Sequence, residues 1–190
     1  MIMLVEIREE FSEVLSEYEK ISIAFEVRSV LRAELIDRGL GGIKFFEEAV
    51  APYVKDYDVY EKPSDWPNRF ETTNWGFLCA YIGQFRVGGA TVVWKTPGVD
   101  MLENHSDVTC LWDLRVDPSY RDKGIGHQLF NSAIEWSRQR NCWNLKVETQ
   151  NINVHACKFY ARQNCELRAI DRDAYDKNLN EIQLLWHKNI

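Results

Sequence analysis

The chain has 190 residues, of which 45% are hydrophobic and 27% charged, and its formal net charge is −6. This size and composition predict a single globular domain over residues 1–190 with one core. No apolar run approaches the roughly 18 residues that cross a bilayer, and the acidic start is unlike a signal peptide, so we expect a cytoplasmic protein without a membrane partner. The acidic balance also argues against a nucleic-acid partner, because phosphate backbones are bound by a basic surplus.

The acidic surplus lies in the first third of the chain. Residues 1–70 carry 15 acidic and 9 basic residues, whereas residues 71–190 carry 14 of each. If the first third lines a cleft, its potential favours a cationic small molecule. The alternative is that these acids are solvated helix faces.

The five cysteines are an odd number, widely spaced, and without a C-x-x-C pair. This pattern is typical of reduced thiols and not of a disulfide framework or a zinc site. We therefore expect no structural metal.

The first half of the chain predicts short and irregular elements. Residues 9–19 have the apolar spacing of a short acidic amphipathic helix, and residues 25–35 alternate like a half-buried strand. The glycine-containing segment 37–42 ends that strand. Residues 45–60 are ambiguous, because a proline interrupts any helix while the Tyr and Val content suits an extended segment. Two prolines predict a loop over residues 61–70.

The second half predicts strands that alternate with helices, which indicates an α/β or α+β sheet domain. The apolar strand at 108–116 is expected to be central in the sheet, and Asn153 is a candidate N-cap. The predicted elements are an antiparallel hairpin (75–83 and 86–95), the strand 108–116, an amphipathic helix (124–140), a strand (145–149), a helix (153–163) and two final strands (165–170 and 181–187).

A basic turn with two glycines joins the strand 108–116 to the following helix. Gly124 and Gly126 allow a ligand close to the backbone, and the helix N-terminus favours negative charge there. Arg121 and Lys123 add positive charge. The spacing is neither the Walker pattern nor the dinucleotide fingerprint, so a pyrophosphate on another carrier is the better match. The alternative is a glycine turn that only starts a helix.

The successive segments LWDLRV, RDKGIG, HQLFNSAIEWSRQR, LKVETQ and NVHACKFYARQ resemble the GNAT superfamily of acyl-CoA N-acyltransferases over about residues 75–170. The resemblance implies a mixed α/β fold with a mostly antiparallel sheet whose central strands splay apart, and acetyl-CoA as co-substrate. It implies that the basic turn binds the CoA pyrophosphate and that the preceding strand bonds the pantetheine arm. The residues so implied are Leu114, Arg115, Val116, Arg121, Asp122, Lys123, Gly124, Ile125, Gly126 and His127.

A second motif, NVHACKFY, starts at Asn153 and resembles the N-x-x-A-x-x-F-Y pattern of the same superfamily. The resemblance implies that Tyr160 is the general acid that protonates the leaving thiolate, and that Asn153 and Lys158 lie near the CoA arm. Helix capping alone would also explain Asn153. Because the superfamily transfers the acyl group directly to the amine, Cys157 and Cys165 are expected to be packing residues.

The general base is not identified by the motifs, because Trp112 stands where many relatives carry Glu. Asp113 and Glu148 lie on the two strands that are expected to flank the acyl slot, and both are candidates. A structural carboxylate is the alternative for each. Asn164 replaces a glycine of the pattern, and Asn tolerates the left-handed turn that glycine would make.

The longer runs WDLRVDPSYRDKGIG and KVETQNINVHACKFYARQNCELRAI, with AYDKNLNEIQLLWHK near the C-terminus, are similar to the streptothricin acetyltransferase branch of this superfamily. The resemblance implies acetylation of an amino group on the β-lysine part of a cationic antibiotic, and hence antibiotic resistance. Residues 1–70 and the final strands are then expected on the acceptor side, with Asp65, Glu71 and Tyr175 as possible members, and residues 75–170 as the acetyl-CoA-binding core.

Three alternatives stay open. The first is a GNAT enzyme that acetylates a protein N-terminus, a lysine side chain or a polyamine. The second is a CoA-binding module that has lost its chemistry. The third, a nucleotide-binding regulator, is disfavoured because no Walker lysine or ribose-reading acid is present. The seven tryptophans fit either a large core or an interface, so both a monomer and a homodimer are consistent with the sequence.

Overall fold

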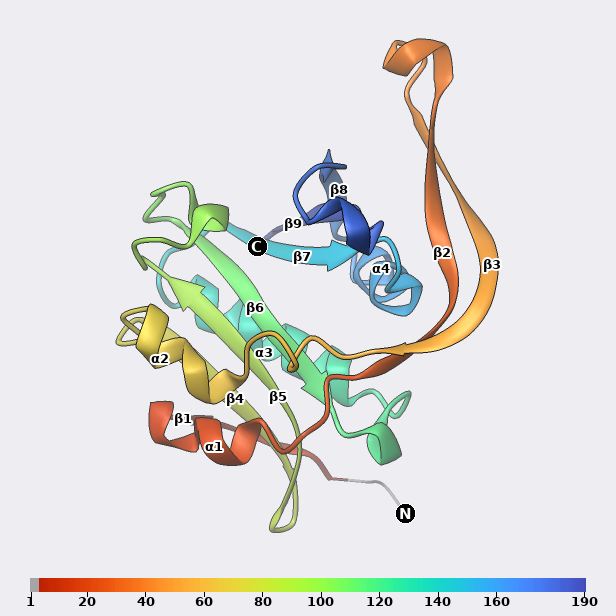
Figure 1. Ribbon diagram of the computed structural model, residues 1–190. Coiled ribbons are helices and arrows are strands. Elements are labelled where there is room, and N and C mark those ends of the chain that lie inside the picture. The colour runs from red at the N-terminus through yellow and green to blue at the C-terminus, as the bar shows by residue number, and fades with distance from the viewer. Residues whose placement is uncertain (1–3) are drawn as a thin grey trace. The chain divides into compact units, whose positions relative to one another are not determined.

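The computed structural model describes residues 4–190 (Figure 1). Their contacts divide the chain into two compact units. The first unit holds the chain up to Ile23, then Asp56–Val147 and His187–Ile190, and the second holds Ala24–Lys55 and Glu148–Trp186. The single-domain organisation stays a prediction.

The first unit is built on a sheet with the order β1-β4-β5-β6-β7, beyond which lie the last residues of β9. The pairs β1–β4, β4–β5 and β5–β6 are antiparallel, and β6–β7 is parallel. This confirms the predicted mixed, mostly antiparallel sheet. The strands are β1 (Glu6–Glu10), β4 (Trp75–Ile82), β5 (Phe85–Trp94), β6 (Val108–Val116), β7 (Asn144–Gln150) and β9 (Gln183–Asn189).

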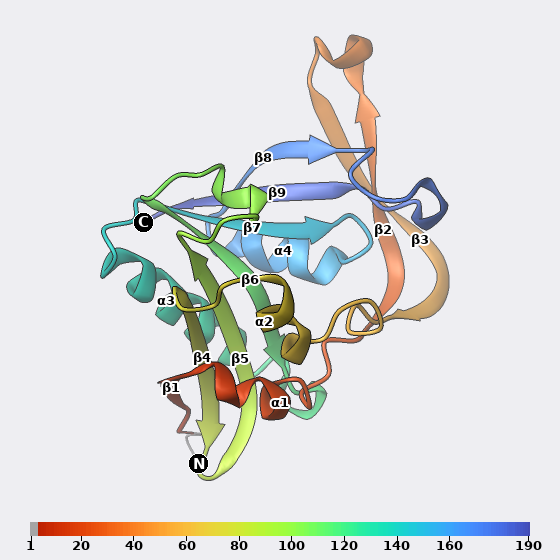
Figure 2. The same ribbon diagram turned by 60° about the vertical axis from the view of Figure 1, so that its left-hand side comes forward.

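Helices cover both faces of this sheet (Figures 1 and 2). The short helices α1 (Leu15–Tyr18) and α2 (Trp66–Arg69) pack on one face in an aromatic-rich core, together with side chains of β4 and β6. Helix α3 (Ile125–Arg138) covers the other face and buries the stripe that its sequence spacing predicts. None of the helices between residues 4 and 190 combines the length and the apolar character needed to cross a bilayer.

Two predictions for the first third are wrong in detail. The helix expected over 9–19 is confined to the 3-10 turn η1 (Ser12–Val14) and α1, because Glu6–Glu10 form β1 along β4, and Phe11 is 84% exposed. The loop expected over 61–70 contains the 3-10 turn η3 (Pro63–Asp65) and α2. Prolines are tolerated there, since the first N–H groups of a helix have no partner within it.

The second unit contains a long antiparallel ribbon of β2 (Phe25–Leu35) and β3 (Ile43–Lys55), joined by the 3-10 turn η2 (Ile36–Gly39). The ambiguous segment 45–60 is therefore mainly strand. Among residues 4–190, β3 pairs only with β2, and an edge position tolerates its proline. The remaining elements are the end of β7, helix α4 (Val154–Arg162), β8 (Glu166–Asp171), the 3-10 turn η6 (Lys177–Leu179) and β9, with the order β7-β9-β8.

Gly89 of β5 is required by the packing of α1 on the sheet. A Cβ at this position would lie 2.2 Å from Cε2 of Tyr18, whose side chain is fully buried. We expect Gly89→Ala to lower the free energy of unfolding by about 1–3 kcal/mol, measured by urea denaturation. In a Tyr18→Ala background the same substitution should cost much less, and equal costs in both backgrounds would contradict this explanation.

Candidate active site

Strand β6 contains a β-bulge in its middle. Leu111 opposes Val92 of β5 and Asp113 opposes Thr91, so Trp112 is the extra residue. The parallel ladder from β6 to β7 ends at the bulge, with Leu111 opposite Val147. Bulges of this kind commonly redirect side chains next to active sites.

The end of β6 offers backbone groups on one edge. Residues Leu114–Val116 pair with Gly88–Ala90 of β5, and within the described residues of the first unit no strand pairs with their other edge. An extended ligand can add to such an edge by main-chain hydrogen bonds. This is the segment for which the sequence predicts contact with the pantetheine arm.

Trp112 belongs to an aromatic cluster on the α2 face of the sheet. Its ring lies 5.4 Å from Phe70 and 5.7 Å from Trp75, centroid to centroid, and it is partly buried against the core. Edge-to-face and tilted pairs at these distances are favourable. The aromatic residue that replaces the expected Glu thus has a packing function.

Asp113 lies in a buried ionic network centred on Arg115, whose side chain is 1% exposed. Arg115 bonds Asp113 through Nε–Oδ1 (2.9 Å) and Nη2–Oδ2 (2.8 Å). It bonds Asp58 at 2.9 and 3.0 Å and donates to the carbonyl oxygen of Ile21 at 3.0 Å. The Tyr18 hydroxyl donates to Asp113 Oδ1 at 2.6 Å. These contacts give Asp113 a structural function, whatever else it does.

The network holds Arg115 charged. Burial opposes the charge, but Asp113 and Asp58 outweigh it, so the pKa of Arg115 is raised above its ordinary value. Burial, with the negative charge of Asp113, raises the pKa of Tyr18 well above its ordinary value, so Tyr18 donates as a neutral hydroxyl. Burial also raises the pKa of Asp58, partly opposed by its hydrogen bonds from Arg115.

The turn that follows β6 is held by its own basic side chains. Arg121 donates from Nε to the carbonyl oxygen of Val116 at 3.0 Å and from Nη2 to that of Ser22 at 3.1 Å. Lys123 Nζ donates to the carbonyl oxygen of Ser119 at 2.8 Å. Burial lowers the pKa of Arg121 from its ordinary value. The basic side chains therefore shape the loop as well as adding charge.

The backbone of this turn leads directly into α3. Asp122 and Gly124 have φ of 59° and 83°, and Gly124 is the N-cap of α3 without a side-chain cap. The first N–H groups of a helix have no partner within it, and the helix dipole favours an anion there. His127, one turn into the helix, contacts Asn131 at 3.0 Å. The predicted pyrophosphate site thus has the backbone geometry of an anion site.

Glu148 lies in a hydrogen-bonded cluster of the second unit. Its Oε1 accepts from the Tyr175 hydroxyl at 2.5 Å and from Gln150 Nε2 at 3.4 Å, and its Oε2 accepts from Gln183 Nε2 at 2.8 Å. Burial and the charge of Glu148 raise the pKa of Tyr175, so this hydroxyl stays protonated and donates. Tyr175, one of the three residues proposed for the acceptor side, thus contacts the candidate base Glu148.

Tyr160 lies on the buried face of α4, with its ring 5.1 Å from that of Phe159. Cys157 is on the same face, 3.4 Å from the Thr149 hydroxyl, and burial raises the pKa of its thiol to about 11. All five cysteines are buried free thiols. A buried thiol that stays protonated at neutral pH is a poor nucleophile, in agreement with a packing function for Cys157.

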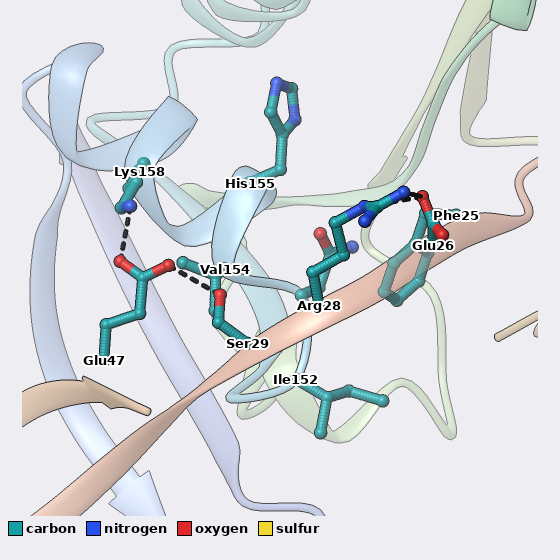
Figure 3. Close-up of a pocket in the computed structure, with 10 residues that line it drawn as sticks. Phe25, Glu26, Arg28, Ser29, Glu47, Ile152, Val154, His155 and Lys158 are labelled. Carbon is teal, nitrogen blue, oxygen red and sulfur yellow. Dashed lines mark hydrogen bonds and ion pairs between the residues drawn. The ribbon is translucent and has the colours of Figure 1, made fainter. Parts of the chain in front are cut away.

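Asn153 and Lys158 line a pocket of about 270 Å³ in the second unit, between β2 and the start of α4 (Figure 3). The Asn153 side chain caps α4 by accepting from the N–H of Ala156 at 3.1 Å, as predicted. Lys158 Nζ lies 2.6 Å from Glu47, which also accepts from Ser29. The basic residues of this pocket are therefore matched by acidic ones, and Arg28 pairs likewise with Glu26.

The predicted site residues divide between the two units. The network of Asp113, the edge Leu114–Val116 and the turn 121–127 belong to the first, and Glu148, Asn153, Lys158 and Tyr160 to the second. Sequence reasoning missed Tyr18, Asp58 and Gln183. The only sequence signal for Tyr18 was its apolar spacing, which does not indicate a hydrogen bond. Asp58 and Gln183 had no sequence signal, because their partners are distant in the chain.

The acidic surplus of residues 1–70 is partly neutralised by local ion pairs. Exposed carboxylates on the early strands and on α1 pair with basic side chains, often two or three residues away, as in Glu6–Arg8 and Glu17–Lys20. Asp65 and Glu71 accept backbone N–H groups of their own loops. Part of the surplus is thus a set of solvated faces.

The chain belongs to the acetyltransferase (GNAT) family, whose profile matches residues 43–164. It is therefore an acyltransferase with a GNAT fold. Streptothricin acetyltransferase A of Bacillus subtilis is 34% identical over 91 residues, which are 47% of this chain and 53% of that protein. The streptothricin acetyltransferase of Escherichia coli is 28% identical over 166 residues, 86% of this chain and 84% of that protein.

A solved structure supports the same assignment. A Bacillus anthracis protein assigned as a streptothricin acetyltransferase, in complex with acetyl coenzyme A, superposes with a TM-score of 0.77 at 25% identity, over 98% of this chain and 100% of that one. The chain thus has streptothricin acetyltransferase homologues, although it spans only about half the length of the B. subtilis relative.

Arg115 is expected to be essential for stability. Arg115→Leu leaves Asp113 and Asp58 without their cation, so we expect the free energy of unfolding to fall by about 3–5 kcal/mol, measured by chemical denaturation at neutral pH. Arg8→Leu, which removes an exposed ion pair, is the matched control and should change it by less than about 1 kcal/mol. If Arg115→Leu lowers the free energy of unfolding no more than Arg8→Leu does, the buried network is not important for stability.

Proposed function

We propose that the chain transfers the acetyl group of acetyl-CoA to a primary amine of a cationic small molecule of the streptothricin type. The alignment with the E. coli streptothricin acetyltransferase, which spans most of both chains, carries this proposal. The acetyl coenzyme A complex of the B. anthracis protein supports the choice of acyl donor. The amine, and any function in antibiotic resistance, are inferred from these relatives.

The first unit would bind acetyl-CoA mainly through its backbone. The N–H groups at the start of α3 suit the pyrophosphate, and the edge of Leu114–Val116 suits the amide-containing pantetheine arm. Arg121 supports this arrangement indirectly, because it fixes the carbonyl of Val116 and thereby the end of the strand. Asn153 and Lys158 are the residues of α4 that we assign to the CoA arm.

The reaction removes two protons from the acceptor nitrogen and delivers one to sulfur. The base removes a proton from the acceptor ammonium, the amine nitrogen forms a bond to the thioester carbonyl carbon, and the C–S bond breaks as Tyr160 protonates the departing thiolate. The nitrogen then loses its second proton, which restores the Tyr160 hydroxyl, so the products are an acetamide, free CoA and the proton held by the base. The acetyl group passes directly to nitrogen, so no cysteine carries it.

Of the two candidate bases, the contacts favour Glu148. Both oxygens of Asp113 are occupied by Arg115, and one also by Tyr18, in a nearly solvent-free setting. Protonation of Asp113 would break its ion pair with Arg115. Glu148 is only partly buried, and its donors are neutral hydroxyl and amide groups. It can therefore take up a proton without breaking an ion pair.

An acceptor comparison tests the proposed activity. We expect acetyl-CoA-dependent release of free thiol with streptothricin, and much less with spermidine or a lysine peptide, measured at equal acceptor concentrations. Selective release with the peptide or the polyamine would instead identify one of the alternative substrates. Binding of acetyl-CoA without turnover of any acceptor would favour a non-catalytic module.

Gly126→Glu tests the pyrophosphate site. The substitution places bulk and negative charge in the first turn of α3, so we expect the affinity for acetyl-CoA to fall at least about tenfold by calorimetry. Gly126→Ala is the matched control and should bind nearly normally. Unchanged affinity of the Glu variant would remove this turn from the site.

The pH dependence of kcat/KM tests the base. We expect Glu148→Gln to lower kcat/KM by about 10²–10⁴-fold and to abolish the acidic limb of the profile. Tyr175→Phe removes one of the donors that orient this carboxylate and should lower kcat/KM by a smaller factor than Glu148→Gln, because Gln183 still donates to it. Asp113→Asn should mainly lower stability; loss of the acidic limb in this variant alone would assign the base to Asp113.

A further inference from the structure

The distal half of the β2–β3 ribbon is unusually apolar for an exposed element. We define the distal ribbon as residues 31–35, 43–49 and the turn between them, which ends the ribbon in Figures 1 and 2. Five of the fourteen large hydrophobic side chains that are exposed among residues 4–190 lie in the distal ribbon. They are Leu35, Ile36, Leu40, Ile43 and Phe46.

The distal ribbon has no core of its own. The small core of the second unit contains Val27, Val30 and Ile152, with Phe25 and Val50 against it. No residue of the two distal strand segments is buried, and only Leu31, Ala33 and Phe45 are partly buried. An isolated two-stranded ribbon is at best marginally stable in water. In addition, among residues 4–190 no third strand pairs with β3, so its outer edge is open to another strand.

The outer edge of β3 is complementary to itself. Only every second residue of a strand presents its N–H and C=O to a given edge. Two identical edges therefore pair antiparallel only in registers that place even-numbered residues opposite even-numbered ones and odd-numbered residues opposite odd-numbered ones. Centred on Phe46, such a register places Lys44 opposite the second copy's Glu48, and Ile43 opposite Ala49. A register centred on Glu47 would place the Glu47 side chains of the two copies opposite each other. A register centred on Phe45 would place Lys44 opposite the second copy's Phe46.

We propose that two copies of this chain associate along β3, antiparallel and centred on Phe46, to form a four-stranded sheet with twofold symmetry. Each copy contributes Lys44 to one ion pair and Glu48 to the other, with the two Phe46 rings between them. Such an isologous contact uses the same patch on both copies and closes after two subunits. Cross-strand opposite charges and aromatic pairs stabilise a sheet.

The existing contacts of the distal ribbon agree with this register. Glu48 also pairs with Arg32 of β2 at 3.0 Å, so in the dimer it lies between two cations. Glu47 points to the opposite face and is already held by Lys158 and Ser29. The proline of β3 lies beyond the paired segment and does not interrupt it.

Charge exchange tests this dimer, with sedimentation velocity over a range of protein concentrations as the measurement. The unaltered chain should show a concentration-dependent dimer. Lys44→Glu and Glu48→Lys should each raise the dimer dissociation constant at least about tenfold, because each creates two symmetry-related like-charge contacts. A 1:1 mixture of the two variants should dimerise again, since both contacts in the mixed pair are then of opposite charge. The double variant should also regain dimerisation.

Glu166→Lys is the matched control. Like Glu48→Lys, it replaces an exposed glutamate that pairs with an arginine of the same chain, in this case Arg168 on β8. Because β8 is not part of the proposed contact, association should be unchanged. Circular dichroism melts establish that each variant folds. Recovery of dimerisation in the 1:1 mixture is a second test, because a misfolded variant would not regain it. A chain that is monomeric at every concentration, or a dimer that neither charge reversal weakens, would overturn the proposal.

Discussion

The buried charge of Arg115 is the constraint on which the first unit depends. A guanidinium removed from water must be matched by anions and hydrogen-bond acceptors, because an uncompensated charge in the interior costs several kcal/mol. Here the match comes from β6 itself, from Asp58 and from the carbonyl of Ile21, while Tyr18 completes the coordination of Asp113. The segments that precede and follow the ribbon are thereby tied to the strand that is expected to meet the acyl donor, so this strand is held rigidly by polar contacts as well as by its sheet partners.

The two units carry candidate groups of different kinds. In the first, the groups assigned to ligand binding are main-chain N–H and C=O groups at a strand edge and a helix start, and its charged side chains mostly hold the backbone in place. In the second, a carboxylate with neutral donors, a buried tyrosine and the capped helix α4 supply groups that can move protons. The groups proposed to hold the acyl donor are thus mostly main-chain groups, whereas the groups proposed to move protons are side chains.

The helix α3, the cap at Asn153, the hairpin of β4 and β5 and the apolar strand β6 were predictable, because each rests on local periodicity or a local capping signal. Strand β1 was not predictable, because its mostly charged sequence has no apolar alternation and the strand is defined by its pairing with β4. The candidate site shows the same division. The glycine turn follows from adjacent residues, whereas the contact of Tyr18 with Asp113 joins residues 95 positions apart and the bulge at Trp112 depends on register with β5.

The proposed recognition of the acyl donor through the edge of β6 has an evolutionary consequence. A ligand that hydrogen-bonds to main-chain groups does not read the side chains of Leu114 and Val116, so these positions can vary as long as the strand persists. Likewise the extra residue at the bulge is an aromatic ring that packs on Trp75, and β6 pairs with β5 on either side of it. Under this proposal, homologous chains can differ in the side chains of this strand and retain the same acyl donor.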